Sequence, residues 1–137
     1  MKLDDIIFRG QDVKGKWWRG TPVRETNKEK DKWRICIDKY DRMQAEVKPE
    51  TIGQYTGSQD SDDKKIFEGD IVKITKNKTV IYNKEVKWDN EKKALGINYY
   101  MFGKIFVLTL DLITSFDSVE IIGNIFDNPE LLEEETK

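Results

Sequence analysis

The stretch Ile66-Phe67-Glu68-Gly69-Asp70-Ile71-Val72 decides the fold class. Two apolar residues precede a Glu-Gly-Asp step, and β-branched residues resume directly after it, which is typical of a strand, a sharp corner and a second strand. Glycine permits the backbone conformation of such a corner, and an aspartate beside it can cap backbone N–H groups. The stretch therefore predicts a β-rich protein in which this corner is a structural element.

Short apolar runs with period-two alternation recur on both sides of this stretch. Trp33, Ile35 and Ile37 share one face of a predicted strand, and Val86 and Trp88 share a face of another. Turn residues separate such runs at spacings of roughly 8–12 residues, as in small barrels and sandwiches. We therefore predict a mainly β fold with minor α content.

Composition excludes several kinds of chemistry. The 137 residues contain no histidine and a single cysteine, Cys36. Ser-His and Cys-His nucleophile pairs and His-ligated zinc sites are thereby excluded, as are an internal disulfide and a thiolate zinc cluster. The position of Cys36 between Ile35 and Ile37 predicts a buried residue rather than a reactive thiol. These features favour a non-enzymatic protein without a cofactor, in a reducing compartment.

The net charge of −2 hides an asymmetry along the chain. Residues 1–50 carry a net +3, residues 51–90 are neutral and residues 91–137 carry a net −5. An isoelectric point near 5.4 argues against a dedicated duplex binder, whose surface would be basic. The first residues are already charged, so we expect no targeting segment, no membrane association and a cytoplasmic location.

Three stretches carry a resemblance to a known family. They are Ile7-Phe8-Arg9 with the following Asp12, Lys14 and Trp17-Trp18; Val47 to Gly57 followed by Asp60 and Ile66 to Val72; and Val119 to Leu132. In this order they are similar to the signature of the YopX family of phage and prophage proteins. The resemblance implies an SH3-like barrel in the C-terminal half, and it implies no catalytic residue.

On this basis we expect a single YopX-like domain with three regions. An N-terminal β region covers residues 1–57, the SH3-like barrel region covers residues 58–128, and a short terminal helix and tail cover residues 129–137. Asn128 and Pro129 suit the N-cap and first position of that helix, which should end near Glu134. The expected structural motif residues are Gln54, Tyr55, Thr56, Gly57, Glu68, Gly69, Asp70, Gly123, Asn124 and Pro129.

The turn Ser61-Asp62-Asp63-Lys64 departs from the family pattern. Family members tend to have a glycine in this turn, and aspartate tolerates positive φ less well than glycine. The geometry of the turn therefore stays open at this point.

A second group of residues forms a candidate interaction surface. Aromatic side chains alternate with Arg9 and Arg24 in the net-positive first third, and either stacked bases or a protein interface would suit them. Because adjacent strand residues point to opposite faces, we expect one of Trp17 and Trp18 to be buried and the other to be exposed or at an interface. A dense aromatic patch beside Gly103 suits self-association if it lies on an edge or in a loop, and otherwise it forms part of the core. The surface comprises Trp17, Trp18, Arg19, Trp33, Tyr99, Tyr100 and Phe102.

Two acidic groups suggest a third class of function. Asp60, Asp62 and Asp63 offer oxygen ligands for a hard cation, but the loop lacks the glycine and the bidentate glutamate of a calcium loop. Glu68 and Asp70 flank a glycine, yet two nearby carboxylates act as an acid–base pair only in a pocket that separates their pKa values. For both groups we favour a structural role over a catalytic or metal site.

The function that we predict is a non-enzymatic protein–protein interaction or assembly module, encoded by a phage or prophage and acting in the cytoplasm of the bacterial host. It binds a protein partner whose identity the sequence does not give, or a second copy of itself. One alternative is a nucleic-acid-binding accessory protein that uses the basic, tryptophan-bearing first third. The other is a divalent-metal-dependent hydrolase.

Overall fold

The computed structural model describes residues 6–26, 31–37, 43–76, 78–101, 104–109 and 118–135. The chain divides into two compact units, residues 1–55 and residues 56–137. The division falls two residues before the boundary at Gly57 that the sequence predicts. All strand pairings in the described residues are antiparallel, and the prediction of a mainly β fold is confirmed.

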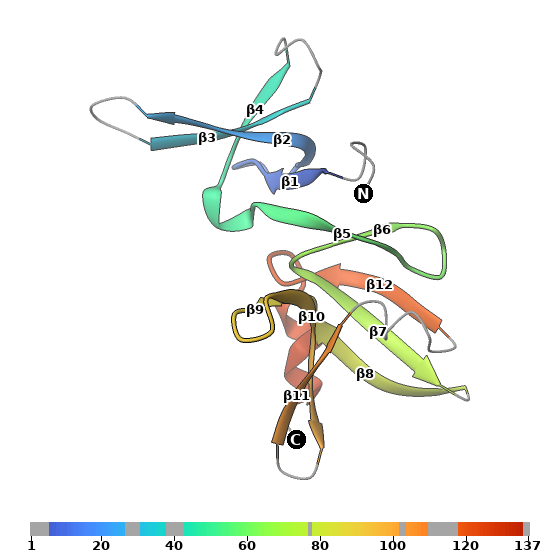
Figure 1. Ribbon diagram of the computed structural model, residues 1–137. Helices are drawn as coiled ribbons and strands as arrows, with labels where there is room; N and C mark the ends of the chain where they lie inside the picture. Colours follow the sequence, from blue (N-terminus) through green and yellow to red (C-terminus); the bar gives the residue numbers. More distant parts are fainter. Residues whose placement is uncertain are drawn as a thin grey trace. The chain divides into compact units, whose positions relative to one another are not determined.

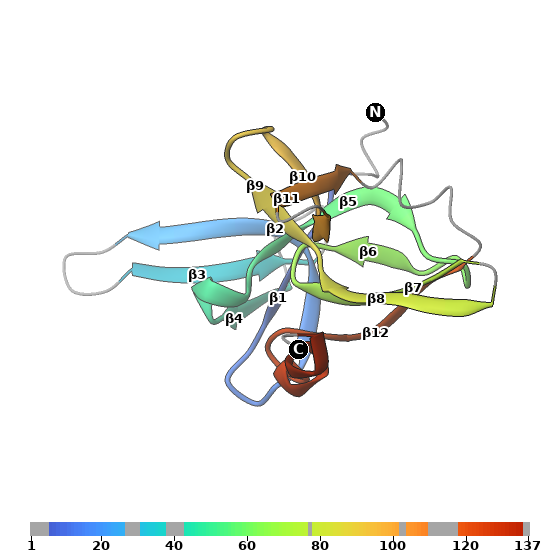
Figure 2. The same ribbon diagram turned by 90° about the horizontal axis from the view of Figure 1, so that it is seen from below.

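The first unit is an antiparallel sheet with the strand order β4-β3-β2-β1-β5. Strands β2 and β3 form its long hairpin, which both views show extended side by side (Figures 1 and 2). The elements are β1 (Phe8–Gln11), β2 (Trp17–Thr26), β3 (Asp31–Cys36), β4 (Gln44–Val47), the 3₁₀ helix η2 (Pro49–Thr51) and the beginning of β5 (Gly53–Gln59).

The buried residues of the first unit follow the strand register. Ile35 is fully buried and Val47 almost fully, and their pairing partners place both on the same side of the sheet. Gly10 lies so close to Val47 that a Cβ at this position would be 2.9 Å from Cγ2 of Val47. Cys36 is also buried, which confirms the prediction for this residue.

The second unit contains two three-stranded sheets, with the orders β12-β7-β8 and β11-β10-β9. It begins with the remainder of β5 and continues with β6 (Lys65–Phe67), β7 (Asp70–Lys76), β8 (Thr79–Glu85), β9 (Lys87–Asp89), β10 (Ala94–Met101), β11 (Lys104–Thr109), β12 (Ser118–Asn124) and the 3₁₀ helix η3 (Pro129–Glu135). Among the described residues no sheet closes into a barrel. The terminal helix that we expected is 3₁₀ in the structure.

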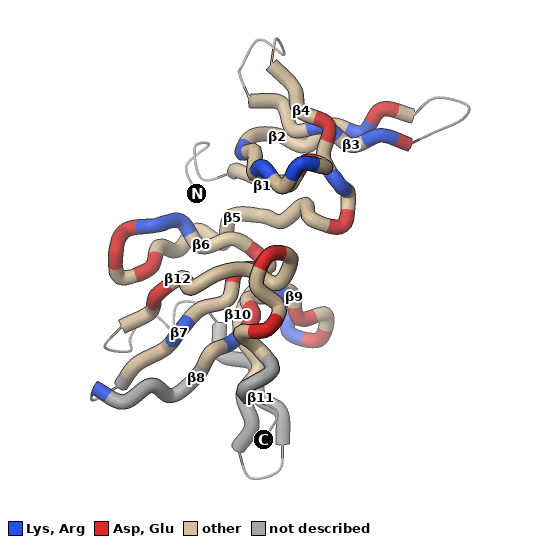
Figure 3. Tube along the Cα trace, turned by 180° about the vertical axis from the view of Figure 1, so that it is seen from behind, with Lys and Arg blue, Asp and Glu red and all other residues tan. Residues whose placement is uncertain are grey.

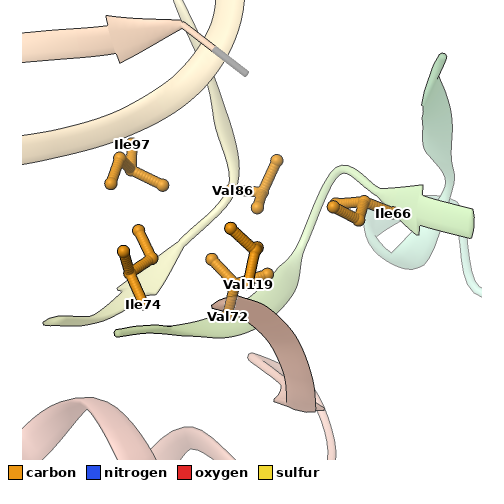
Figure 4. Packing of buried hydrophobic residues seen from close by; sticks show 6 residues of the cluster. All are labelled: Ile66, Val72, Ile74, Val86, Ile97 and Val119. Carbon is orange, nitrogen blue, oxygen red and sulfur yellow. The ribbon is translucent and has the colours of Figure 1, made fainter. Parts of the chain in front are cut away.

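The core of the second unit gathers residues from strands of both sheets (Figure 4). Its members are buried aliphatic side chains, against which Leu95 and Ile121 pack. They are Ile66, Val72, Ile74, Val86, Ile97 and Val119. The segment that decided the fold class thus supplies most of β6, the corner and the beginning of β7, and its residues Ile66 and Val72 belong to this core. Within the described residues, no helix has the length and apolarity needed to cross a membrane.

Candidate functional site

Trp17 and Trp18 open strand β2, and each ring lies beside a cation of the same unit. The guanidinium carbon of Arg9 is 4.5 Å from the ring centroid of Trp17, and Nζ of Lys16 is 4.2 Å from that of Trp18. Both tryptophans are half-buried, so the expectation that one of them is buried is wrong. The reason is that the cationic side chains cover part of each ring in a way that strand alternation alone does not show.

The other predicted surface residues of the first unit lie farther along the same sheet. Arg19 is exposed and pairs across the ladder with Arg9, whereas Trp33 is half-buried. The guanidinium carbon of Arg24 is 5.9 Å from the ring centroid of Trp33, and the guanidinium group forms an ion pair with Asp31. A second ion pair joins Nη2 of Arg34 to Oε2 of Glu25 at 3.1 Å.

The turn between β1 and β2 (residues 12–16, the Asp12 turn) is held by one carboxylate. Oδ1 of Asp12 accepts the backbone N–H groups of Lys14 and Lys16, each at 2.9 Å, and Oδ2 accepts the indole N–H of Trp18 at 3.0 Å. Gly15 takes a φ of 88°, and its N–H donates to the carbonyl of Asp12. The hydrogen bond from Trp18, followed by those from the backbone, lowers the pKa of Asp12.

The turn between β5 and β6 (residues 60–64, the Asp60 turn) repeats this pattern. Oδ1 of Asp60 accepts the N–H groups of Asp62 and Lys64, each at 2.9 Å. Asp63 takes a φ of 62°, and its N–H donates to the carbonyl of Asp60. Asp63 therefore occupies the place of Gly15, and the turn keeps its shape without a glycine, which settles the geometry that the sequence left open. Both turns have the form of a type I turn followed by a left-handed residue.

The second oxygen of Asp60 reaches a different strand. Oδ2 accepts the N–H of Ile121 in β12 at 3.1 Å. Burial alone would raise the pKa of this carboxyl group, but the hydrogen bonds from Lys64, Ile121 and Asp62 outweigh that effect and lower the pKa. Asp60 thus stabilises the turn and joins it to β12.

Asp62 and Asp63 are both exposed, and the described part of the chain contains no group of three or more His, Cys, Asp or Glu residues arranged to hold a metal ion.

The Glu68-Gly69-Asp70 corner is fixed by backbone and carboxylate hydrogen bonds. Oδ2 of the buried Asp70 accepts the N–H of Phe67 at 2.7 Å, three residues earlier in the chain. Gly69 has a φ of 94°, and its N–H donates to the carbonyl of Val86. Asp70 therefore stabilises the corner between β6 and β7.

The closing motif lies beside this corner. Asn124 pairs with Asp70 across the β12–β7 ladder, and the N–H of Ile125 donates to the carbonyl of Gly69. A Cβ at Gly123 would be 2.5 Å from Oδ1 of Asn128, which explains the glycine. That same oxygen accepts the N–H of Asn124 at 3.3 Å. The side chain of Asn128 therefore closes the turn before it. Its backbone carbonyl accepts the N–H of Leu131, so Asn128 lies at the expected cap position of the helix that begins at Pro129.

The remaining motif residues lie on β5. Gln54 pairs with Phe8, and the buried Tyr55 donates its N–H to the carbonyl of Ile7. Oγ1 of Thr56 donates to the carbonyl of Ile66 at 2.7 Å, while Gly57 has a φ of 85°. These residues connect neighbouring strands and form no recognisable site.

The predicted aromatic patch is described only in its backbone. Tyr99 and Tyr100 lie in β10, opposite Phe106 and Ile105 of β11. Phe102 lies outside the described residues.

Sequence reasoning missed the common design of the Asp12 and Asp60 turns. The signal was present as two pentapeptides of the form Asp-x-x-(Gly or Asp)-Lys, at residues 12–16 and 60–64. It also missed that Ser61 contacts β12. The N–H of Ser61 donates to the carbonyl of Val119 at 2.8 Å, and Oγ of Ser61 accepts the N–H of Val119 at 2.9 Å. No local pattern indicates a contact between residues so far apart in the sequence.

These features define an antiparallel β protein whose motif residues mainly close turns and corners. The family model described as YopX protein matches residues 7–133, nearly the whole chain, and the protein belongs to the YopX family. A comparison with curated proteins found no match.

Proposed function

We propose that this protein is a non-enzymatic protein-interaction module and that its first unit carries the binding surface. The observation that carries the proposal is the distribution of exposed large apolar side chains. Among the described residues, five of the six exposed large apolar residues lie in the first unit, and none of them belongs to the buried core. They are Ile6, Val13, Val23, Ile37 and Met43, whereas Trp88 lies in the second unit. Exposed apolar surface of this kind favours contact with another protein.

The charged groups of the first unit support a protein partner over a nucleic acid. Arg24 and Arg34 already pair with carboxylates of the same sheet, so phosphate groups would have to compete with Asp31 and Glu25. Cations beside Trp17 and Trp18 likewise compete with stacked bases for the rings.

A hydrolase is supported less well by the same geometry. Each oxygen of the Asp60 carboxylate already accepts backbone N–H groups, and the Asp70 carboxylate accepts that of Phe67. Lone pairs engaged in this way are poorly placed to bind a metal ion or to transfer a proton.

Two finer features belong to the same proposal. The first is an SH3-like barrel in the second unit, which its two three-stranded antiparallel sheets and shared core support. The second is an origin in a phage or prophage, with action in the host cytoplasm, for which family membership is the support. The partner is a host or phage protein. The alternative form of the proposal is self-association, and light scattering over a range of protein concentrations tests it.

A comparative affinity capture tests the proposal. The wild-type chain and two variants are used as baits in a lysate of the bacterium that encodes the chain. One variant carries Val23→Ser, Ile37→Ser and Met43→Ser, and the matched control carries Trp88→Ser in the second unit. We expect at least one protein to be enriched by the wild type and the control and lost from the triple variant. Equal recovery by all three baits, or no enriched protein together with a monomer by light scattering, would overturn the proposal.

Nucleic-acid binding is tested separately by fluorescence anisotropy with a labelled single strand. We expect no saturable binding at low salt. Binding that weakens steeply with added salt would show that the basic first unit contacts phosphates and would replace the protein-interaction proposal.

A further inference from the structure

The Asp60 turn shows what this turn design does within the second unit. Its second residue, Ser61, receives strand β12 through two hydrogen bonds with Val119, one through its N–H and one through its hydroxyl oxygen. A third hydrogen bond joins Ile121 to the carboxylate of Asp60. The turn is therefore the place where an extended segment, distant in sequence, is bound.

The Asp12 turn has the same framework, but its second carboxylate oxygen accepts the indole N–H of Trp18, and its second residue, Val13, has no hydroxyl. Of the three positions that hold β12 at the Asp60 turn, the Asp12 turn therefore keeps the backbone N–H of its second residue. Val13 occupies the position that Ser61 occupies in the other turn, and the residue is 86% exposed. Its N–H has no acceptor among the residues that the structure describes. Folding requires Asp12 for the hydrogen bonds and Gly15 for the positive φ, but it sets no requirement that a β-branched apolar residue occupy position 13.

We infer that the Asp12 turn is a preformed docking tip that receives an extended segment of a partner protein, as the Asp60 turn receives β12. The inference rests on the proposed function and deepens it by naming the contact. The segment should place an apolar side chain against Val13 and a backbone carbonyl opposite its N–H. It should also carry a carboxylate, because Lys14 and Lys16 flank the tip and the first unit is net positive (Figure 3).

The rigidity of the turn favours binding. Three hydrogen bonds to the Asp12 carboxylate and two within the backbone hold residues 12–16 in one conformation before a partner arrives. A partner then loses little free energy in ordering the loop. The same hydrogen bonds leave Val13 as the residue that projects from the turn.

The probe that tests the inference is a synthetic peptide with the sequence of Ser118–Asn124, blocked at both ends. This segment is apolar and carries Glu120, and it has the chemistry of the strand that the Asp60 turn binds. The peptide is titrated into the ¹⁵N-labelled full chain at low salt, and amide chemical shifts are followed by NMR. We expect saturable shifts at Val13, Lys14 and Lys16.

Matched variants assign the contact to the turn. Val13→Ser should weaken peptide binding about fivefold, because the contact loses most of a buried valine side chain. Trp88→Ser removes an exposed apolar side chain of the second unit, outside the proposed binding surface, and should leave the affinity unchanged. A peptide with Glu120→Lys should bind more weakly than the unsubstituted peptide, since it places a cation beside Lys14 and Lys16.

Three results of the peptide titration would overturn the inference. They are the absence of shifts at Val13 at the highest peptide concentration, shifts confined to residues 56–137, and equal affinities for the Val13→Ser and Trp88→Ser variants. Shifts at Val13 that grow with protein concentration without peptide would identify a second copy as the occupant and would also overturn it. The proposed function is judged independently, because affinity capture reports on a whole partner at the surface that contains Val23, Ile37 and Met43, whereas the peptide titration reports on the Asp12 turn alone.

Discussion

The Asp12 turn and the Asp60 turn are built alike and used differently. In each, one aspartate oxygen accepts the N–H groups two and four residues later, and the fourth residue takes a positive φ. The other carboxylate oxygen binds the Trp18 indole in the first unit and the backbone of β12 in the second. The local sequence therefore shapes the turn, whereas the second residue and the second carboxylate oxygen determine which other group the turn binds.

The largest expected effect is a difference in stability between variants of Asp60 and of Asp12. Asp60→Ala should lower the free energy of unfolding by about 3 kcal/mol, because it removes three charge-assisted hydrogen bonds and leaves the N–H of Ile121 without its acceptor. Asp12→Ala should cost clearly less, since its turn lies in solvent, where water replaces the lost acceptor. Urea unfolding followed by circular dichroism measures both variants. Equal losses would show that the contact with β12 contributes nothing.

The next effect concerns the residue with positive φ. Gly15→Ala should cost about 1.5 kcal/mol, because alanine pays the steric penalty of the left-handed region. The space around Gly15 is otherwise open, so the cost arises from the backbone alone. The reciprocal change, Asp63→Gly, should stabilise the chain by about 0.5 kcal/mol. Thermal unfolding measures the melting temperature of both variants. Changes of the same sign in the two melting temperatures would contradict a shared backbone geometry of the two turns.

A smaller effect distinguishes the two second residues. Ser61→Ala should cost about 1 kcal/mol, because the N–H of Val119 loses its side-chain acceptor. Val13→Ala should change stability by less than about 0.5 kcal/mol, as expected for a strongly exposed residue. The same urea measurement serves for both. A loss at Val13 as large as that at Ser61 would mean that Val13 packs within the chain.

The smallest effect is a difference in pH dependence between two carboxyl groups of the second unit. Hydrogen bonding lowers the pKa of Asp60, so its contribution to stability is present above the pKa of the unfolded chain and is lost as the pH falls through the folded value. Burial raises the pKa of Glu85, the charge of Lys87 opposes this, and nearby Glu68 adds to it. Ionised Glu85 therefore destabilises the fold at neutral pH.

Glu85→Gln should consequently stabilise the chain slightly at pH 7, and the gain should disappear when the pH falls below about 4, where glutamate is protonated in both states. Asp60→Asn should behave in the opposite way, with a loss at pH 7 that shrinks in acid. Unfolding free energies between pH 3 and pH 7 measure both trends. A gain for Glu85→Gln that persists in acid would show that its charge is not the cause.

Much of the fold was predictable because the relevant signals are local. The apolar stretch from Ile66 to Val72 gave the strand, corner and strand, and the position of Cys36 between two isoleucines gave its burial. Family membership followed from motifs that bracket the chain. Strand β4 (Gln44–Val47) was not expected, since the residues before it show no clear period.

What sequence reasoning could not supply was the choice of hydrogen-bond partners. An aspartate in a turn predicts that backbone N–H groups will be capped, but not that one carboxylate will reach the indole of Trp18 and another a strand about 60 positions away. The burial of Trp17 and Trp18 was mispredicted for the same reason, because neighbouring cations lie over the rings. Such partners depend on tertiary structure, which neither strand alternation nor turn composition predicts.

The most direct test of the comparison is amide hydrogen exchange of the full chain, read residue by residue by NMR. The N–H groups of Lys14, Lys16 and Ser61 should be protected, because each has an acceptor in its own unit. The N–H of Val13 should exchange close to the rate of an unstructured peptide. Protection at Val13 equal to that at Ser61, or exchange at Lys14 and Lys16 as fast as at Val13, would contradict the claim that two like turns differ in what they hold.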